Sequence, residues 1–172
     1  MPPSPFPLLS ADTYLAMIRG SVGSALYRHN YALVEGKRED LVRNGQRSCA
    51  FYVTHILVFF QLVREPHLRV EGTVRDLLAT GWQRTDTPKI GDIVVWEEQV
   101  FDGSWEGVTF TSEPHPHIGF YLSSTEAISN SPREGGPAHH HLTFGTQEDG
   151  SPNVQIQAFY THPTFFNDCS ER

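Results

Sequence analysis

Residues 48–63 read SCAFYVTHILVFFQLV, and apolar side chains fall on nearly every face of the helix that this segment predicts. A helix that is apolar all round is buried inside a domain. Cys49 would stand at the N-terminus of this helix, directly after a loop that contains Gly45. Unpaired N–H groups at a helix N-terminus favour a thiolate and can also hold an oxyanion. The segment therefore predicts a core helix that carries a candidate nucleophile.

The segments around this helix change character along the chain. Helical spacing of apolar residues predicts one helix from Ser10, as its cap, to Gly20, and another that Thr73 caps and Gly81 ends. The second half holds short β-type runs at residues 93–96, 118–122, 127–128, 141–144 and 154–160. Helices followed by strands predict an α+β fold.

The composition of the 172 residues fits one globular domain that spans residues 1–172, with an irregular Pro-rich segment at residues 1–9. Thirteen basic and 20 acidic residues give a formal charge of -7, and no Lys- and Arg-rich stretch is present, which argues against nucleic acid as a partner. No secretory signal or membrane-spanning run is visible, so the cytoplasm is the default expectation and no membrane contact is predicted. Cys49 and Cys169 are expected to be free thiols, and the oligomeric state is left open.

A histidine at the start of a predicted strand supplies a candidate base for Cys49. His117 precedes a run that alternates into a core, and Gly119, on the same face of the strand, clears space beside the imidazole. The next strand ends with Ser129 and Asn130, either of which is placed to orient the imidazole. The amide oxygen of Asn130 is the better acceptor, but the strand register is needed to choose between the two.

A metal site is the competing interpretation. No His-Glu-x-x-His and no Cys-x-x-Cys motif is present. Consecutive histidines on a strand point to alternate faces, so at most two of the three at 139–141 share one ion. We therefore predict neither a metal nor a cofactor, and a non-catalytic binding domain that holds a metal through its histidines stays the alternative. The candidate ligands are His115, His117, His139, His140, His141 and His162.

Three segments, taken in order, resemble the NlpC-like branch of the papain-fold cysteine peptidases. They are Ser48–Val53 at the start of a helix, Pro88–Trp96 with its Gly-Asp turn, and His117–Leu122. The resemblance covers roughly residues 48–131 and implies an α+β, papain-like fold in which N-terminal helices pack on a small antiparallel sheet. The family commonly has Asp-Cys-Ser where this chain has Ser48-Cys49-Ala50.

The resemblance also implies roles for the candidate residues. Cys49 corresponds to the nucleophile and His117 to the base, while Ser129 falls nearest to the family's third residue, often a histidine, with Asn130 beside it. Members of the family typically hydrolyse peptide bonds of cell-wall peptides, so the expected activity is that of a thiol hydrolase, a cysteine peptidase or amidase, on a peptide or small amide. Acyl transfer at the same site is the enzyme alternative. Residues 96–116 are expected to form an insertion-like loop that walls the cleft or covers the core.

Overall fold

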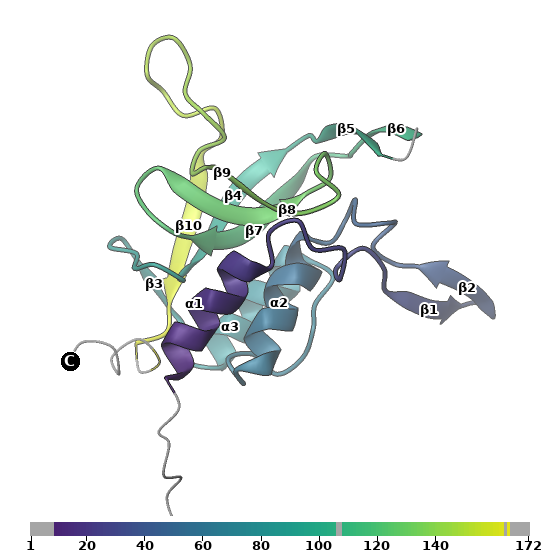
Figure 1. Ribbon diagram of the computed structural model, residues 1–172, viewed down its shortest axis with the longest axis horizontal. Helices are drawn as coiled ribbons and strands as arrows, with labels where there is room; N and C mark the ends of the chain where they lie inside the picture. Colours follow the sequence, from purple (N-terminus) through teal and green to yellow (C-terminus); the bar gives the residue numbers. More distant parts are fainter. Residues whose placement is uncertain (1–8, 106–107, 164, 166–172) are drawn as a thin grey trace, which may run out of the picture.

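The computed structural model describes residues 9–105, 108–163 and 165, which form an α+β fold (Figure 1). Within these residues, the helices are α1 (Ser10–Gly20), α2 (Cys49–Phe59) and α3 (Val70–Ala79). An antiparallel six-stranded sheet has the order β3 (Gln83–Thr85), β10 (Ile156–Thr161), β4 (Ile93–Gln99), β7 (His115–Tyr121), β8 (Glu126–Ser131) and β9 (Gly136–His141). Two hairpins complete the fold, β1 (Tyr31–Val34) with β2 (Lys37–Asp40) and β5 (Asp102–Trp105) with β6 (Val108–Thr111).

The helices lie together on one side of the six-stranded sheet, which therefore has two different faces (Figure 1). Ile118 and Phe120 of β7 pack with α2 in the larger core. On the opposite face, Val94 and Trp96 of β4 pack with Leu142 in a smaller core. Successive strand residues point to opposite faces. Neighbours along β7 consequently serve different cores.

Helix α2 is the buried helix that residues 48–63 predict. Its residues from Cys49 to Leu57 are buried, apart from a half-buried His55. The hydroxyl of Thr54 is satisfied inside the helix, where it donates to the main-chain oxygen of Ala50 over 2.7 Å. None of the helices in the described ranges is long and apolar enough to cross a membrane.

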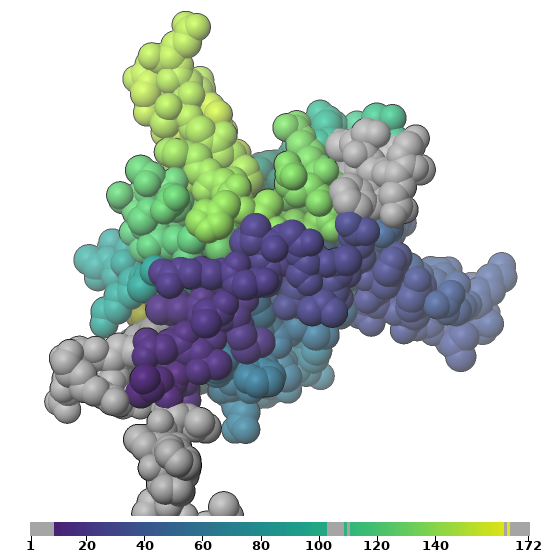
Figure 2. Space-filling view, viewed as in Figure 1, coloured from purple at the N-terminus to yellow at the C-terminus, as the bar shows by residue number. Residues whose placement is uncertain are grey.

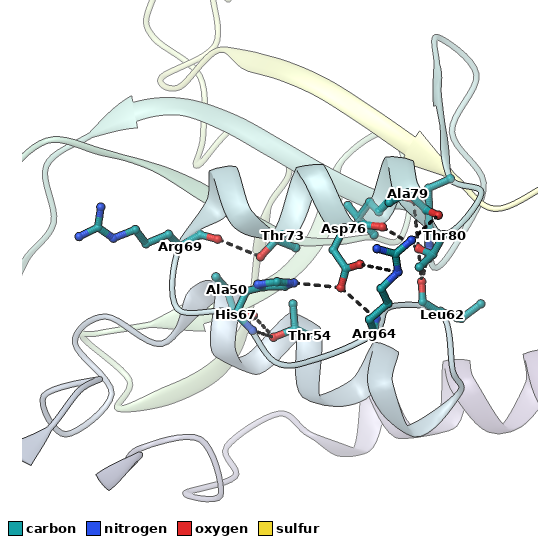
Figure 3. Close-up of polar contacts among 12 residues, drawn as sticks. Ala50, Thr54, Leu62, Arg64, His67, Arg69, Thr73, Asp76, Ala79 and Thr80 are labelled. Carbon is teal, nitrogen blue, oxygen red and sulfur yellow. Dashed lines mark hydrogen bonds and ion pairs between the residues drawn. The ribbon is translucent and has the colours of Figure 1, made fainter. Parts of the chain in front are cut away.

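A buried carboxylate fixes the connection between α2 and α3 (Figure 3). Asp76 Oδ2 accepts a 2.9 Å hydrogen bond from the Arg64 N–H and lies 2.9 Å from His67 Nε2. Burial acts to raise the pKa of Asp76, but hydrogen bonds from His67 and Arg64 outweigh it and hold the pKa below its usual value. The His67 N–H donates to Thr54 Oγ1, which in turn bonds Ala50. This network ties the connection to the first turn of α2.

The predicted starts of two helices are corrected by the structure. Helix α3 begins at Val70, and Thr73 lies inside it, where its hydroxyl donates to the Arg69 carbonyl over 3.0 Å instead of capping the helix. Helix α1 begins at Ser10 itself, and Leu9 occupies the cap position without a side-chain hydrogen bond. In both cases a hydroxyl that suits a cap was read as the boundary, although packing of the apolar face decides where the helix starts.

The strand predictions are confirmed for most of the sheet and wrong at two places. The strand expected at residues 141–144 lies earlier in the chain, as β9, which ends at His141. Phe144 has a φ of 56°, a turn conformation that a strand does not use. Pro137 is tolerated in β9 because β9 is an edge strand. Residues 96–116, expected to be a loop, contain the end of β4 and the β5–β6 hairpin.

The segment after α1 runs across the β8–β9 hairpin, as the purple band against the green atoms in Figure 2 shows. Its Gly23 N–H donates to the Pro137 carbonyl over 2.8 Å. A Cβ atom on Gly136 would lie 2.5 Å from the main-chain oxygen of Ser24, so only glycine allows this close approach. Main-chain contacts thus hold the hairpin against the N-terminal half of the chain.

Candidate active site

Cys49 begins α2, as predicted, with 8% of its surface exposed. Its sulfur lies near backbone N–H groups of the first helical turn, including that of Ala50, and near the Ile118 N–H of β7. Burial raises the pKa of the thiol to about 11, and these N–H groups lower the pKa only in part. The N–H groups at the helix terminus thus favour the thiolate, as expected, but burial outweighs them. At neutral pH Cys49 is a protonated thiol.

The thiol reaches β7 because β7 and β8 part at this point. Their pairing stops short of Ile118 and Asn130. Beyond it, the Ile118 N–H interacts with the sulfur of Cys49, and Asn130 Nδ2 donates to the Gly45 carbonyl over 2.8 Å. The start of α2 and its preceding loop take the place of the missing strand partner. Main-chain N–H groups thus contact the sulfur of Cys49 at this opening, and the Asn130 amide holds the loop that precedes it.

His117 lies on the sheet face opposite the helices, with 2% of its surface exposed. Its ring packs against Phe101, Trp96 and Phe144, with centroid distances of 4.7, 5.5 and 5.9 Å. Burial lowers the pKa of His117 well below its usual value, and the charges of nearby histidines act in the same direction. His117 is consequently neutral at neutral pH.

One ring nitrogen of His117 is close enough to Ser129 for a hydrogen bond, and the other has no hydrogen-bond partner among the described residues. Nε2 lies 2.8 Å from Ser129 Oγ, whereas Nδ1 is buried and has no hydrogen-bond partner among the described residues. A neutral imidazole carries one donor and one acceptor nitrogen, so one ring nitrogen can accept a proton. Ser129, not Asn130, contacts the imidazole, because Asn130 points to the other face of β8 and bonds Gly45. Of the two candidates that the sequence left open, Ser129 is therefore the one that contacts His117.

Cys49 meets β7 at Ile118, the residue next to His117, without a direct bond to the His117 side chain. Within the described ranges, no hydrogen bond joins Cys49 Sγ to His117 Nδ1, and the sulfur instead meets the backbone of Ile118, the next residue along. The predicted hydrogen-bonded contact is therefore not formed in this resting structure. Hydrogen bonds between a nucleophile and its base are often long without substrate and tighten when substrate binds.

Gly119 performs the role that the sequence predicts for it. A Cβ atom at this position would lie 2.6 Å from the Ile128 carbonyl oxygen, 2.7 Å from Ser129 Cβ and 3.1 Å from the Trp96 ring. Contacts this short are not tolerated by backbone atoms. The missing side chain allows Ser129 and Trp96 to approach His117 together.

The thiol opens into a cavity of about 430 Å³. A wider depression of about 850 Å³ adjoins this cavity at Val70, Glu71 and Pro116, and the two together are called the groove. His117 does not line the cavity, whereas its neighbours His115 and Pro116 do. The cavity is lined by Leu41, Arg47, Cys49, Leu68, Arg69, Val70, Glu71, Ser112, Glu113, His115 and Pro116.

Sequence reasoning missed a contact of His140, which it treated only as a metal ligand. His140 Nε2 lies 2.8 Å from Ser129 Oγ, on the side opposite the exposed His139 and His141. The side chains of residues 139–141 thus point to alternate faces of the strand, as predicted. The sequence alone did not show that this strand begins at Gly136. In the described part of the chain, no three metal-binding side chains gather into a cluster.

Comparison with known proteins adds no relative. No family model, curated protein or solved structure matches this chain. The likeness of residues 48–131 to the NlpC-like peptidases is thus a resemblance of motifs, and the chemistry of the site is derived from its geometry. Cys169 lies outside the described residues, so its free thiol stays a prediction.

Proposed function

We propose that the chain is a thiol hydrolase of the papain-like, NlpC type, a cysteine peptidase or amidase that cleaves a peptide or amide bond. One observation carries the proposal. The sulfur of Cys49 lies at a helix N-terminus and at the backbone of Ile118 in β7, the residue that follows His117, a neutral histidine whose Nδ1 has no partner among the described residues. A nucleophile, a base and oxyanion donors are the parts that amide hydrolysis requires.

The reaction follows from these positions. The thiol proton of Cys49 passes to His117 Nδ1 as the sulfur attacks the carbonyl carbon. First-turn N–H groups, including that of Ala50, stabilise the oxyanion. The intermediate collapses as the C–N bond breaks, and the leaving amine takes the proton from His117. Water then attacks the acyl-enzyme with His117 as base, which releases the acid and restores the thiol.

The groove supports a peptide-like substrate. It consists of the cavity that Cys49 lines and the wider depression that adjoins it at Pro116, and two adjoining depressions suit an extended chain better than a compact molecule. Its walls carry both charges, with Arg47 and Arg69 on one hand and Glu71 and Glu113 on the other. Together with the motif resemblance, this makes cell-wall-type peptides the first substrates to test. An amine acceptor in place of water would give acyl transfer, and only product analysis separates the two reactions.

The test is turnover of a substrate panel followed by mass spectrometry. The panel contains α-linked and γ-linked short peptides, peptides with D-residues, and simple amides. Cys49→Ala and His117→Ala are expected to abolish turnover, with folding checked by circular dichroism, while Cys169→Ala, the matched control, keeps it. Undiminished turnover in Cys49→Ala contradicts the mechanism.

A second candidate function is a binding domain in which Cys49 is an unreactive buried residue. The raised pKa of the Cys49 thiol and the lack of a bond to His117 Nδ1 favour it. In that case no peptide or amide in the panel is cleaved, and the alkylation rate of Cys49 does not depend on His117.

A further inference from the structure

We propose that His140 is a positioning residue which, acting through Ser129, holds His117 in the tautomer that leaves Nδ1 free to accept the thiol proton. The inference rests on the proposed function, since it assigns a role in the same proton transfer. His140 belongs to β9, Ser129 to β8 and His117 to β7, so the three residues form a chain across adjacent strands. None of the motifs in the sequence includes His140.

The distances define a continuous hydrogen-bonded chain. Ser129 Oγ lies 2.8 Å from His117 Nε2 and 2.8 Å from His140 Nε2. At its far end, His140 Nδ1 lies 2.8 Å from the main-chain oxygen of His141. Each member thus has a partner on either side, except His117, whose Nδ1 has no hydrogen-bond partner among the described residues and ends the chain.

The main-chain oxygen fixes the direction of every bond in this chain. A carbonyl oxygen can only accept, so His140 Nδ1 carries the hydrogen. Because a neutral imidazole has a single N–H, His140 Nε2 must then accept from the hydroxyl of Ser129. The oxygen of Ser129 in turn accepts from Nε2–H of His117. The lone pair of His117 is left on Nδ1.

Both imidazoles are neutral, which this reasoning requires. Burial lowers the pKa of His140, as it does that of His117, and the neighbouring histidines of β9 lower it further. Packing holds the ring of His140 in place, because it stacks on Phe144 with a centroid distance of 4.2 Å and an interplanar angle of 13°. Phe144 also contacts His117, so one aromatic ring supports both histidines.

A serine in the third position needs this support. A hydroxyl can both donate and accept, so Ser129 alone could equally donate to His117 Nε2. His117 would then carry its hydrogen on Nδ1, facing away from the role of a base. Because the Ser129 hydroxyl donates its hydrogen bond to His140 Nε2, it can no longer donate to His117 Nε2, and the tautomer of His117 with hydrogen on Nδ1 is disfavoured.

The experiment is a double-mutant cycle on the alkylation of Cys49 by iodoacetamide at neutral pH, in a Cys169→Ala background. His140→Phe keeps an aromatic ring against Phe144 but removes the acceptor, and we expect it to slow alkylation by about tenfold, the effect of one lost hydrogen bond. Ser129→Ala should slow alkylation at least as much, and adding His140→Phe to Ser129→Ala should cause no further loss. His140→Gln, whose amide oxygen can accept from Ser129, should recover most of the rate.

His139→Phe is the matched control, because His139 is exposed on the other side of the same strand, and it should behave as wild type. The inference would be overturned if His140→Phe alkylates at the wild-type rate. It would also be overturned if the double variant alkylates more slowly than Ser129→Ala by the same factor that His140→Phe causes alone. Two-bond ¹H–¹⁵N spectra of the wild type read the tautomers directly, and hydrogen on Nδ1 of His117 would also overturn it. If His117→Gln leaves the alkylation rate unchanged, the proposed function itself fails, whatever His140 does.

Discussion

At Cys49 two effects on the thiol oppose each other, and their sizes decide the outcome. A helix N-terminus stabilises a negative charge by about 0.3–1 kcal/mol near a surface. Burial raises the pKa from 9.0 to about 11, which corresponds to roughly 3 kcal/mol against the thiolate. Desolvation wins, so reactivity depends on a base rather than on a thiolate that is already formed. The sequence could indicate the helix terminus but not the depth of burial.

Ser129 and Asn130 differ by one position and serve opposite faces of β8. Ser129→Ala removes the partner of His117 Nε2, so we expect alkylation of Cys49 to slow about tenfold or more, and the buried N–H left without a partner should also lower the free energy of unfolding by about 1–3 kcal/mol. Asn130→Ala leaves the Gly45 carbonyl without its donor, which should lower the free energy of unfolding by about 1–3 kcal/mol but leave the alkylation rate close to that of the wild type. Urea titrations and alkylation rates measure the two effects. Slow alkylation in Asn130→Ala together with a wild-type rate in Ser129→Ala would show that Asn130 orients the base.

Among the elements, those with a strong pattern could be predicted and those defined by pairing could not. The all-round apolar character of α2 and the β-type runs of β4, β7 and β10 led to elements of the right kind at the right places. β9 was misplaced because its histidines, Gly136 and Pro137 do not form an apolar β pattern, and only pairing with β8 makes it a strand. The β5–β6 hairpin was also missed, although β6 reads Val-Thr-Phe-Thr, because its partner β5 reads Asp-Gly-Ser-Trp and lacks a β-type pattern. His140 depends on β9, and its role was therefore not visible in the sequence.

Gly119→Ala tests how tightly β7, β8 and β4 approach each other. The added methyl group would meet the Ile128 carbonyl, so we expect the free energy of unfolding to fall by about 1–3 kcal/mol. It would also push Ser129 away from His117 and slow the alkylation of Cys49. Gly20→Ala is the control, since nothing lies within 4 Å of a Cβ atom there. It should leave the alkylation rate unchanged and should not lower the free energy of unfolding, because alanine suits a helical position better than glycine. If Gly119→Ala and Gly20→Ala had equal effects on stability and on the alkylation rate, the close packing of Gly119 against Ile128 and Ser129 would be contradicted.

Across the whole molecule, the site lies where the helical layer and both faces of the sheet meet. Cys49 belongs to the helical core, whereas His117 belongs to the aromatic cluster on the other face. At the opening between β7 and β8, the sulfur of Cys49 meets the backbone of Ile118, the residue next to His117. Motif order could predict that Cys49 begins a helix and that His117 lies in a strand of the sheet, but it could not predict that the two groups are a neutral thiol and a neutral imidazole, because both states follow from burial in the assembled fold.

The neutral state of His117 predicts a pH dependence of stability. Its pKa is lower in the folded protein than the usual 6.5, so the unfolded chain binds a proton first as the pH falls. Stability is therefore complete above about pH 6.5 and declines below it, by up to about 1.4 kcal/mol per pH unit for this group. His117→Gln should reduce the decline. Asp92, whose pKa is raised to about 6, acts in the opposite sense but equally in both proteins. The free energy of unfolding is measured by urea titration at several pH values. If it falls equally steeply with decreasing pH in the wild type and in His117→Gln, the result would contradict a buried neutral His117.

The transfer of the Cys49 proton to His117 is tested most directly by the rate of Cys49 alkylation against pH, in the Cys169→Ala background with and without His117→Gln. When the proton moves within a pair, the reactive fraction does not change between the pKa of the base and that of the thiol. We therefore predict a nearly flat rate through neutral pH, and its loss by about a hundredfold or more in His117→Gln. A rate that rises about tenfold per pH unit toward a pKa near 11 in both proteins would contradict the account, because Cys49 would then ionise alone.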